Sequence, residues 1–354
     1  MVISVENTFL SGVVEGFYGR PWSFETRLAY ASYLARMGLN TYLYCPKADP
    51  YLRKRWYHRW PDREFQRLRV LADTYREHSL VFAVGLSPFA LYQNYGVKQR
   101  ALLRAKVEEL NALESPVIAL LFDDMPGEMN DLAVRQCEIV ADLQSWTTAS
   151  RILVCPTYYS FDPVLEKVFG PRPEGYWQQL GQALPADIDI FWTGNKVCSN
   201  SINISDIERI QQRLGRPVIL WDNYPVNDSA LRSGYLYGDK LGDREPGLNK
   251  LLSGHLCNPM NQGVVSLMAL QGLAKLYGVE GVGDTLLREV WGEKAYSQLS
   301  ADLDNFQSLG LSGMGNSRCR ELARVYGKIG GPAAQEVAQW LRGEYTFDPA
   351  CLTD

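Results

Sequence analysis

Eight short apolar runs recur along the first 260 residues of the chain, and they limit the possible fold more than any other feature. They begin at residues 12, 40, 80, 116, 151, 187, 217 and 254. Each run is nearly continuous rather than alternating, which is typical of strands buried on both faces of a parallel sheet. Most are followed by stretches of helical period, over residues 23–37, 61–78, 97–112, 129–148, 202–213 and 262–277.

Eight strand–helix units within about 270 residues have the size of a single (β/α)₈ barrel. An open, doubly wound sheet is the alternative arrangement of parallel strands. No G-x-G-x-x-G motif follows the first run to support that alternative. The crossovers around 171–185 and 225–247 contain proline and glycine and are less regular. We therefore predict an α/β fold of the TIM-barrel type.

The pattern changes after about residue 283. Helices without intervening strands are expected over 286–291, 296–306, 317–329 and 333–345, with breaks at 310–315 and 330–332. The sequence thus predicts a barrel over residues 1–282 and a small helical C-terminal extension over 283–354. The apolar face formed by Leu299, Leu303, Phe306 and Leu309 needs a partner surface. We expect the extension to pack on the barrel or to build a homodimer.

Charge and hydropathy exclude several classes of protein. The net charge of -4 gives no basic footprint, so a nucleic-acid partner is not expected. The apolar runs are too short to span a bilayer, which argues against a membrane protein. The N-terminus has neither a basic region nor a long apolar one, so the chain is expected to be cytoplasmic. A signal peptide that had been removed would leave the same sequence.

The cysteines and histidines are sparse and scattered. The seven cysteines include no C-x-x-C pair, which argues against a disulfide framework and a structural zinc site. The three histidines lie far apart, which argues against a histidine metal site and a Ser-His-Asp triad. We therefore expect no metal and no cofactor, and chemistry that depends on carboxylates.

Two adjacent aspartates, Asp123 and Asp124, end the fourth apolar run. Neighbouring residues on a strand point to opposite faces, so both can face one pocket only if the backbone leaves the strand there. Two buried carboxylates cannot both ionise at low cost, and this favours an acid/base paired with an anionic group. Two alternatives remain: a helix cap beside a solvated aspartate, or a Mg²⁺ site, although no phosphate-binding loop accompanies the pair.

Polar and aromatic residues follow most of the other runs. In a barrel, the carboxyl ends of the strands converge on the face where active sites lie. The residues at these ends are Glu15, Tyr18, Lys47, Asp123, Asp124, Thr157, Tyr159, Thr193, Asp222, Asn223 and Asn258. Three tryptophans, Trp22, Trp192 and Trp221, lie at or just past strand ends. They are either core residues or platforms on which a sugar stacks.

Several of these segments occur in the order found in one enzyme family. They are VVEGFYGRPWS (13–23), NTYLYCPK (40–47), ALLFDD (119–124), CPTYY (155–159), WTGNKV (192–197), WDN with a later ND (221–223, 227–228) and NPMNQ (258–262). Together they resemble glycoside hydrolase family 84, which contains protein O-GlcNAcases and bacterial hexosaminidases. The resemblance covers the whole predicted barrel.

The resemblance implies a role for each matching residue. Asp123 would orient the 2-acetamido group of the substrate through its N–H, and Asp124 would be the general acid and then the base. Tyr159 would hold the acetamido oxygen. The other substrate-binding residues implied are Trp221, Cys155 and Val197 around the acetyl group, Gly16 and Lys47 at the 3-hydroxyl, Asn258 and Asp228 at the 4- and 6-hydroxyls, and Tyr18 and Asn223 in the walls.

The implied activity is that of a retaining exo-β-N-acetylglucosaminidase that removes terminal β-linked GlcNAc, such as O-GlcNAc on Ser or Thr of glycoproteins and glycopeptides. The acetamido oxygen of the substrate would attack C1 and form an oxazoline. Most retaining glycosidases instead use an enzyme carboxylate as nucleophile, roughly 5–5.5 Å from the acid. Two adjacent carboxylates therefore suit the mechanism in which the substrate supplies the nucleophile. Two alternatives are an exo-hexosaminidase for free oligosaccharides or mucin- and hyaluronan-type glycans, and a non-catalytic glycan-binding barrel.

Overall fold

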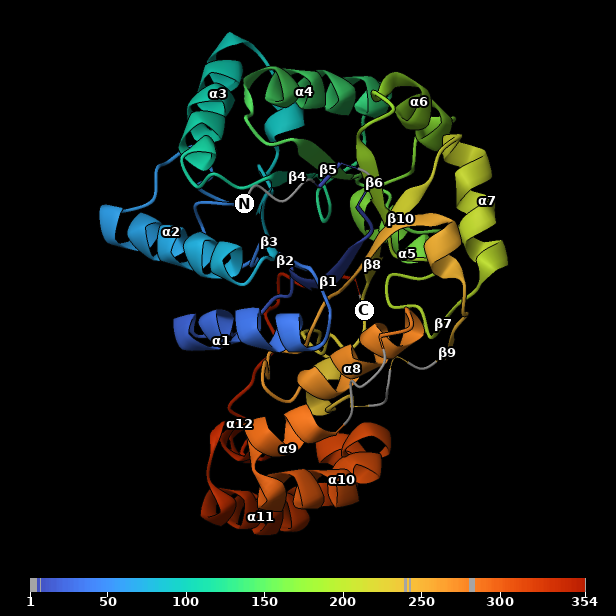
Figure 1. Cartoon of the computed structure of the whole chain (residues 1–354). Coiled ribbons are helices and arrows are strands. Elements are labelled where there is room, and N and C mark those ends of the chain that lie inside the picture. The colour runs from blue at the N-terminus through green and yellow to red at the C-terminus, as the bar shows by residue number, and fades with distance from the viewer. Residues whose placement is uncertain (1–4, 7, 239–240, 242, 280–283, 354) are drawn as a thin grey trace.

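A closed barrel of parallel strands forms the centre of the molecule, and helices surround it (Figure 1). The structure, a computed structural model, describes residues 5–6, 8–238, 241, 243–279 and 284–353. The barrel strands are β1 (Leu10–Glu15), β2 (Thr41–Tyr44), β3 (Val81–Leu86), β4 (Val117–Leu121), β5 (Arg151–Cys155), β6 (Asp189–Trp192), β8 (Val218–Asp222) and β10 (Leu252–Cys257). Their order is β1-β10-β8-β6-β5-β4-β3-β2. The predicted (β/α)₈ barrel is confirmed.

The barrel closes where β1 pairs with β10 on one side and with β2 on the other. The side chains of β1 to β5 are all buried, as their continuous apolar runs predict. Gly12 shows how closely β1 approaches β2. Its φ is 153°, and a Cβ atom at this position would lie 1.9 Å from the carbonyl oxygen of Thr41. Only glycine fits at this point of the closure.

The helices predicted between the strands are present, with small differences in their ends. They are α1 (Phe24–Arg36), α2 (Asp62–Glu77), α3 (Val97–Asn111), α4 (Leu132–Trp146), α7 (Ile204–Leu214) and α8 (Leu267–Leu276). Helix α7 illustrates why these residues form a helix. Asn203 and Asp206 form a capping box at its start, and its buried face carries Ile207, Ile210 and Leu214.

The two irregular crossovers differ from the simple strand–helix pattern. Two short helices, α5 (Pro163–Phe169) and α6 (Tyr176–Ala183), connect β5 to β6. Between β8 and β10, the described residues contain η2 (Arg232–Gly234), β9 (Asp243–Arg244) and η3 (Leu248–Lys250) but no α-helix. Strand β9 pairs with β7 (Ser201–Ile202) in a small sheet that the sequence did not predict.

Four helices follow the barrel: α9 (Thr285–Trp291), α10 (Glu293–Ser308), α11 (Gly310–Ile329) and α12 (Pro332–Leu341). The predicted boundary between residues 282 and 283 lies outside the described residues. The predicted break at 310–315 is present: α10 ends at Ser308, Gly310 begins α11 with a φ of 61°, and Gly315, with a φ of 76°, interrupts the helical backbone of α11. Helix α12 ends earlier than predicted, since Gly343 adopts a φ of 73° just beyond it.

These helices pack on the barrel, one of the two outcomes expected from their apolar faces. The indole N–H of Trp291 donates to the carbonyl of Val264, and that of Trp340 donates to Ser233, each at 3.0 Å. The carboxylate of Glu336 on α12 accepts the N–H groups of Val264 at 2.9 Å and of Val265 at 3.0 Å, just before α8. Desolvation raises the pKa of Glu336 to about 7, although these donors oppose the shift. Homodimerisation through the extension stays a prediction.

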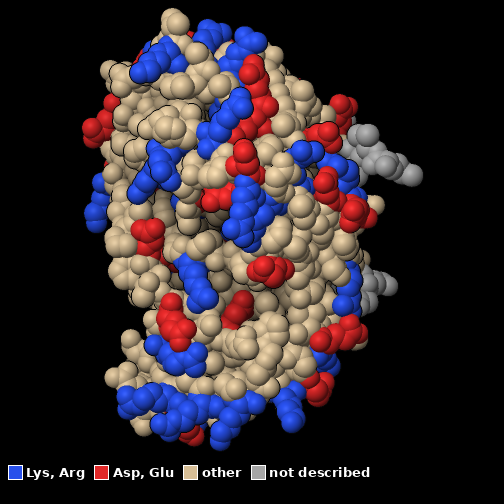
Figure 2. Space-filling view, turned by 90° about the vertical axis from the view of Figure 1, so that its left-hand side faces the viewer, with Lys and Arg blue, Asp and Glu red and all other residues tan. Residues whose placement is uncertain are grey.

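The surface carries both signs of charge. On the face shown in Figure 2, acidic and basic side chains are interspersed over the barrel, and basic ones gather at the lower end, over the C-terminal helices. This mixture forms no basic groove along the barrel on that face, in line with the net charge of -4. Within the described part of the chain, every helix is too short or too polar to cross a membrane.

Removing the Glu336 carboxylate should weaken the docking of α12. At pH 5, where its pKa of about 7 keeps the group neutral and one oxygen still accepts both N–H groups, Glu336→Ala leaves two backbone donors without their acceptor and should lower the free energy of unfolding by about 2 kcal/mol. Urea denaturation measures the change. The control is Glu321→Ala, since Glu321 lies in an exposed ion pair with Arg318 on α11. Equal losses in the two variants would show that Glu336 does not anchor the helix.

Candidate active site

One pocket lies at the carboxyl ends of the barrel strands and contains all of the site residues inferred from the sequence. It encloses about 530 Å³, part of which is open to solvent. The inferred residues that line it are Gly16, Tyr18, Lys47, Asp123, Asp124, Cys155, Tyr159, Val197, Trp221, Asn223, Asp228 and Asn258. Residues from seven loops and strand ends therefore meet here, as the barrel topology requires.

The backbone leaves strand β4 just before the two aspartates, and this departure allows both side chains to face the same pocket. The last ladder bond runs from the N–H of Phe122 to the carbonyl of Cys155, at 2.8 Å. Asp124 then adopts a φ of 55°, in the left-handed region that few non-glycine residues occupy. This turn brings the carboxylates of Asp123 and Asp124 to the same pocket.

Arg53 holds this unfavourable backbone conformation in place. Its side chain donates from Nη2 to the carbonyl oxygen of Asp124 at 3.0 Å and from Nη1 to Ser87 Oγ at 2.7 Å. Arg53 is only 6% exposed, so these bonds lie away from solvent. A buried, charge-assisted bond of this kind is strong enough to stabilise a residue in the left-handed region.

The carboxylate of Asp124 accepts two hydrogen bonds from tyrosines. Tyr18 donates from its hydroxyl to Oδ2 at 2.8 Å, and Tyr159 donates to Oδ1 at 2.9 Å. Burial and the neighbouring Asp124 raise the pKa of both tyrosines well above the usual value, so they stay protonated donors. The two phenols fix the carboxylate from opposite sides and leave it within the pocket.

Asp123 is paired differently. Its Oδ2 accepts a hydrogen bond from Lys47 Nζ, which also lies 3.9 Å from Asp124 Oδ2. Burial would lower the pKa of Lys47, but Asp123 and Asp124 raise it above the usual value. The Oδ1 atom of Asp123 is buried and has no hydrogen-bond partner among the described residues. A buried acceptor of this kind fits an N–H donor on a ligand.

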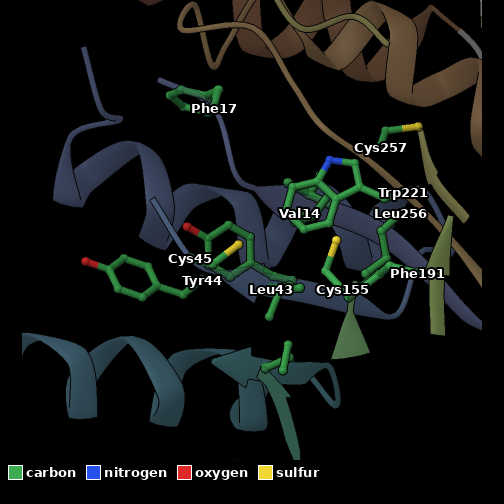
Figure 3. Packing of buried hydrophobic residues seen from close by; sticks show 14 of the residues in the cluster. Val14, Phe17, Leu43, Tyr44, Cys45, Cys155, Phe191, Trp221, Leu256 and Cys257 are labelled. Atoms are coloured by element: carbon green, nitrogen blue, oxygen red, sulfur yellow. The ribbon is translucent and has the colours of Figure 1, made fainter. Parts of the chain in front are cut away.

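An apolar corner lies beside the carboxylates. The Trp221 ring packs edge-on against Phe191 at 5.3 Å, and Figure 3 shows it above the thiol of Cys155. Burial raises the pKa of Cys155 well above the usual value, so this thiol is neutral. Gly16 faces the same ring, and a Cβ atom there would lie 2.2 Å from it. Only glycine leaves room for Trp221 in this position.

Asn223 connects the apolar corner to Asn258 on the adjoining wall of the pocket. Its Oδ1 accepts from Trp221 Nε1 at 3.0 Å and from Asn258 Nδ2 at 2.9 Å, and its Nδ2 donates to the carbonyl of Val197 at 2.8 Å. Asn258 Oδ1 in turn accepts the N–H of Gly16 at 3.2 Å. The wall is therefore held in one conformation before any ligand binds.

Asp228 has no lysine or arginine bonded to its carboxylate among the described residues. Its Oδ2 accepts the backbone N–H of Tyr18 at 2.8 Å. Burial raises the pKa of Asp228 to about 6, and Asp124 adds to the shift, whereas the N–H of Tyr18 and the charge of Arg232 oppose it. Asp228 is thus poised to exchange a proton near neutral pH, unlike an ordinary aspartate.

Two of the three candidate stacking tryptophans are core residues instead. Trp22 donates to the carbonyl of Met260 at 3.0 Å and packs on Tyr30, with ring centroids 4.3 Å apart. Trp192 is fully buried against Phe161 and Trp177. Neither ring lines the pocket, so the interpretation as a sugar platform is wrong for both. Trp221 alone of the three lines the pocket.

Three strand-end residues also serve the framework rather than the pocket. Glu15 pairs with Arg27 at 2.6 Å, and Thr157 donates to the carbonyl of Phe122 at 3.0 Å. Asp222 accepts two hydrogen bonds from Arg244, at 2.6 and 2.8 Å. Burial alone would raise the pKa of Asp222, but Arg244 and His255 lower it to about 2. These side chains use their polar groups inside the protein.

Asp222 belongs to the one group of metal-ligand type found among the described residues, with His255 and Cys257. The residues do not fit a metal, because Arg244 and His255 already use both oxygens of the carboxylate. Burial also raises the pKa of Cys257, which keeps it a thiol rather than the thiolate that metals bind. This cluster is a hydrogen-bond network below the site.

The pocket also contains residues that the sequence did not single out. They are Cys198, Val226, Ser229, Arg232, Cys351 and Thr353, together with Thr193, which was noted only as a strand end. Ser229 and Arg232 follow Asp228 in the irregular loop after β8, where polar residues could have been suspected. No local pattern marks Cys351 or Thr353, which come from the far end of the chain.

Comparison with known proteins places the chain among glycosidases. A family model described as β-N-acetylglucosaminidase matches residues 11–299. The protein O-GlcNAcases of Rattus norvegicus and Mus musculus are each 31% identical over 278 residues, which is 76% of this chain and 30% of each relative. The chain thus matches less than a third of the length of these curated relatives.

Two solved structures share the fold over nearly the whole chain. An aspartate-to-asparagine mutant of the Thermobaculum terrenum O-GlcNAc hydrolase superposes with a TM-score of 0.71 at 26% identity, covering 96% of this chain and 81% of its own. A structure named CpGH84B superposes with a TM-score of 0.74 at 24% identity, covering 95% of this chain and 66% of its own.

The raised pKa of Asp228 predicts a pH-dependent cost to stability. An aspartate with a folded pKa of about 6 binds its proton more tightly than the unfolded chain does. Its stabilising contribution is present below about pH 4 and is lost as the pH rises through 6. Asp228→Asn cannot titrate, so its stability relative to wild type should increase by on the order of 2 kcal/mol from pH 4 to pH 7.5.

Urea unfolding at the two pH values measures this difference. The control is Asp73→Asn, since Asp73 lies in an exposed ion pair on α2. A stability difference for Asp228→Asn that stays constant between pH 4 and pH 7.5 would contradict the prediction.

Proposed function

Because the chain belongs to the β-N-acetylglucosaminidase family, a group of glycoside hydrolases known as family 84, we propose that it is a retaining exo-β-N-acetylglucosaminidase. It removes terminal β-linked GlcNAc, including O-GlcNAc on serine or threonine, and it uses the acetamido group of the substrate as nucleophile. One observation carries this proposal. Among the described residues, Asp123 has a buried oxygen without a hydrogen-bond partner, and it lies beside Asp124, whose own oxygens are held by two phenols.

In the first step, the acetamido oxygen attacks C1 and the bond from C1 to the leaving oxygen breaks. Asp124 gives its proton to that oxygen. The acetamido N–H donates to Asp123 Oδ1, and the Asp123 carboxylate stabilises the positive charge that develops on the nitrogen of the oxazoline ring. Lys47 holds the Asp123 side chain in place for this task, because its ammonium group donates to the other carboxylate oxygen.

In the second step, water attacks C1 from the side that the leaving group has vacated. The ionised Asp124 accepts a proton from this water, the C1–oxygen bond of the oxazoline breaks and the acetamide re-forms. Two inversions at C1 give a product with the original β configuration. Asp124 is protonated again and ready for another cycle.

The shape of the pocket supports an acetamido substrate. Trp221, Cys155 and Val197 provide an apolar corner for the acetyl methyl. The Tyr159 hydroxyl, which donates to Asp124 Oδ1, turns to the acetamido oxygen when the substrate binds and leaves that carboxylate oxygen free to carry the acid proton. Gly16 and Lys47 serve the 3-hydroxyl, and Asn258 and Asp228 serve the 4- and 6-hydroxyls. Tyr18 and Asn223 complete the walls through the hydrogen bonds described above.

Turnover of an aryl β-N-acetylglucosaminide tests the proposal against a glycan-binding barrel. Purified protein should release the phenol, and the product should keep the β configuration when followed by NMR. A protein that binds the glycoside without cleaving it would refute the enzymatic function. Comparing kcat/KM on an O-GlcNAc glycopeptide and on chito-oligosaccharides separates the proposed substrate from that of a general exo-hexosaminidase.

The role of Asp124 as acid predicts a dependence on the leaving group. Asp124→Asn should lower kcat/KM by about 10²–10⁴-fold for substrates with alcohol leaving groups, such as a serine glycopeptide. Activated aryl glycosides need little protonation and should lose much less. Asp73→Asn, on the exposed face of α2, should leave the whole series unchanged. Equal losses across leaving groups of different pKa would exclude Asp124 as the acid.

Substrate assistance predicts a dependence on the acetyl group. Fluorination of the acetyl methyl lowers the nucleophilicity of the acetamido oxygen, so hydrolysis should slow progressively from the monofluoro to the trifluoro derivative. Asp123→Asn should lower kcat/KM on the parent acetamide by on the order of 10²-fold or more, as expected for losing one key electrostatic group. A flat rate across the fluoroacetyl series, or a covalent glycosyl-enzyme on another carboxylate, would overturn this mechanism.

A further inference from the structure

The segment that follows α12, residues 344–353, returns from the helical extension to the mouth of the barrel (deep red in Figure 1). Gly343 turns the chain at the end of the helix. The ring of Tyr345 then lies against the Arg20 guanidinium, 5.0 Å from the ring centroid. The carbonyl of Thr346 lies so close to Gly19 that a Cβ atom there would be 3.3 Å away. The segment therefore follows the loop after β1.

That loop is fixed from its other side as well. Asn261 Nδ2 donates to the carbonyls of Tyr18 and Arg20, each at 2.9 Å. The loop is thus enclosed between Asn261 and the segment. Its position also determines where Tyr18 presents its hydroxyl to Asp124 and its N–H to Asp228. The segment is part of the packing around the site rather than a free end.

The last residues of the segment enter the pocket itself. A turn is closed by the N–H of Cys351, which donates to the carbonyl of Asp348 at 2.9 Å. After this turn, Cys351 and Thr353 line the pocket, and Thr353 is only 9% exposed. Leu352, between them, is 57% exposed. The alternation places two side chains toward the sugar site and one toward solvent.

Cys351 contacts the pocket at Asp228. Its Sγ lies 3.9 Å from Asp228 Oδ1, whereas Oδ2 accepts the N–H of Tyr18. Oδ1 is therefore the oxygen of Asp228 that faces both the pocket and the segment. A sugar hydroxyl bound to Oδ1 would lie beside the Cys351 thiol. A group attached to that hydroxyl would meet Cys351 and Thr353.

We propose that the segment 344–353 is the wall that closes the sugar pocket beside Asp228, with Cys351 and Thr353 as specificity-determining residues. They restrict the enzyme to GlcNAc whose 4- and 6-hydroxyls are unsubstituted. This inference rests on the proposed function and adds to it the end of the pocket at which further sugars are excluded. Strand ends supply the reacting groups, and the segment sets how far the substrate extends beyond them.

The test compares three aryl glycosides: β-GlcNAc itself and its 4-O-methyl and 6-O-methyl derivatives. Wild type should have a higher kcat/KM for the parent than for the methyl ethers. The preference used in the test is the ratio of kcat/KM for the parent to that for whichever methyl ether is cleaved less well. The double variant Cys351→Gly, Thr353→Gly should narrow that preference by roughly tenfold or more, as expected for making room for a methyl group. Leu352→Gly is the matched control, because it loosens the same segment without opening the pocket, and it should keep the wild-type preference.

A complementary variant fills the space instead. Cys351→Leu should raise KM for the parent glycoside with a smaller change in kcat, because the added atoms press on the bound hydroxyls and not on the reacting bond. Thermal unfolding checks that each variant is folded. Rescue of KM by a 4- or 6-deoxy parent glycoside would support the wall, since those substrates lack the crowded hydroxyl.

The outcomes separate the two proposals. A wild-type protein that cleaves none of the glycosides refutes the proposed function, and the inference with it. A wild-type protein that cleaves the parent, together with an unchanged preference in the double variant, refutes the wall alone. A several-fold rise in kcat/KM for all three glycosides in the double variant would also overturn it, because the segment would then be an obstruction rather than part of the pocket.

Discussion

The arrangement of the site depends on one backbone residue, Asp124, held in the left-handed region. Two successive residues of a strand cannot point into one pocket, so the chain must turn between β4 and the second aspartate. Such a conformation costs on the order of 1–3 kcal/mol for a residue with a side chain. The bond from Arg53 to the carbonyl of Asp124 offsets this cost, and the phenols of Tyr18 and Tyr159 fix where the carboxylate then lies.

Four aspartates in the pocket and just below it differ in the groups that their carboxylates contact. Asp222 is paired with Arg244 and His255, which lower its pKa to about 2, so this framework carboxylate stays ionised. Asp123 is paired with Lys47, and its other oxygen has no hydrogen-bond partner in the part of the chain that the structure describes. Asp124 is held by neutral phenols, and Asp228, which accepts from a backbone N–H and from the Cys351 thiol, has a pKa of about 6. Asp222 and Asp228, six residues apart, thus have pKa values that their surroundings shift in opposite directions.

The sequence predicts those features of the protein that the geometry of the strands determines. The barrel followed from eight continuous apolar runs, and eight of the twelve pocket residues lie at strand ends that a closed parallel barrel must bring together. The other four, Gly16, Cys155, Val197 and Asp228, were implied only by the family resemblance. The sequence could not tell which way a tryptophan beside a strand end points, and so Trp22 and Trp192 were open candidates that proved to be core. It also gave no sign of Cys351, since contact with Asp228 across 123 residues depends on how the helical extension docks.

The docking of the helical extension on the barrel also explains why the segment 344–353 reaches the pocket. Nine residues, 342–350, separate the end of α12 from Cys351, and the extended chain from Leu341 to Cys351 could span roughly 35 Å. Length alone would therefore allow many positions. What selects one is a series of contacts: Glu336 fixes α12 against the start of α8, and Tyr345 and Thr346 then guide the chain along Arg20 and Gly19. The selectivity of the pocket is in this way connected to helices that contribute no reacting group, because they determine where its last wall stands.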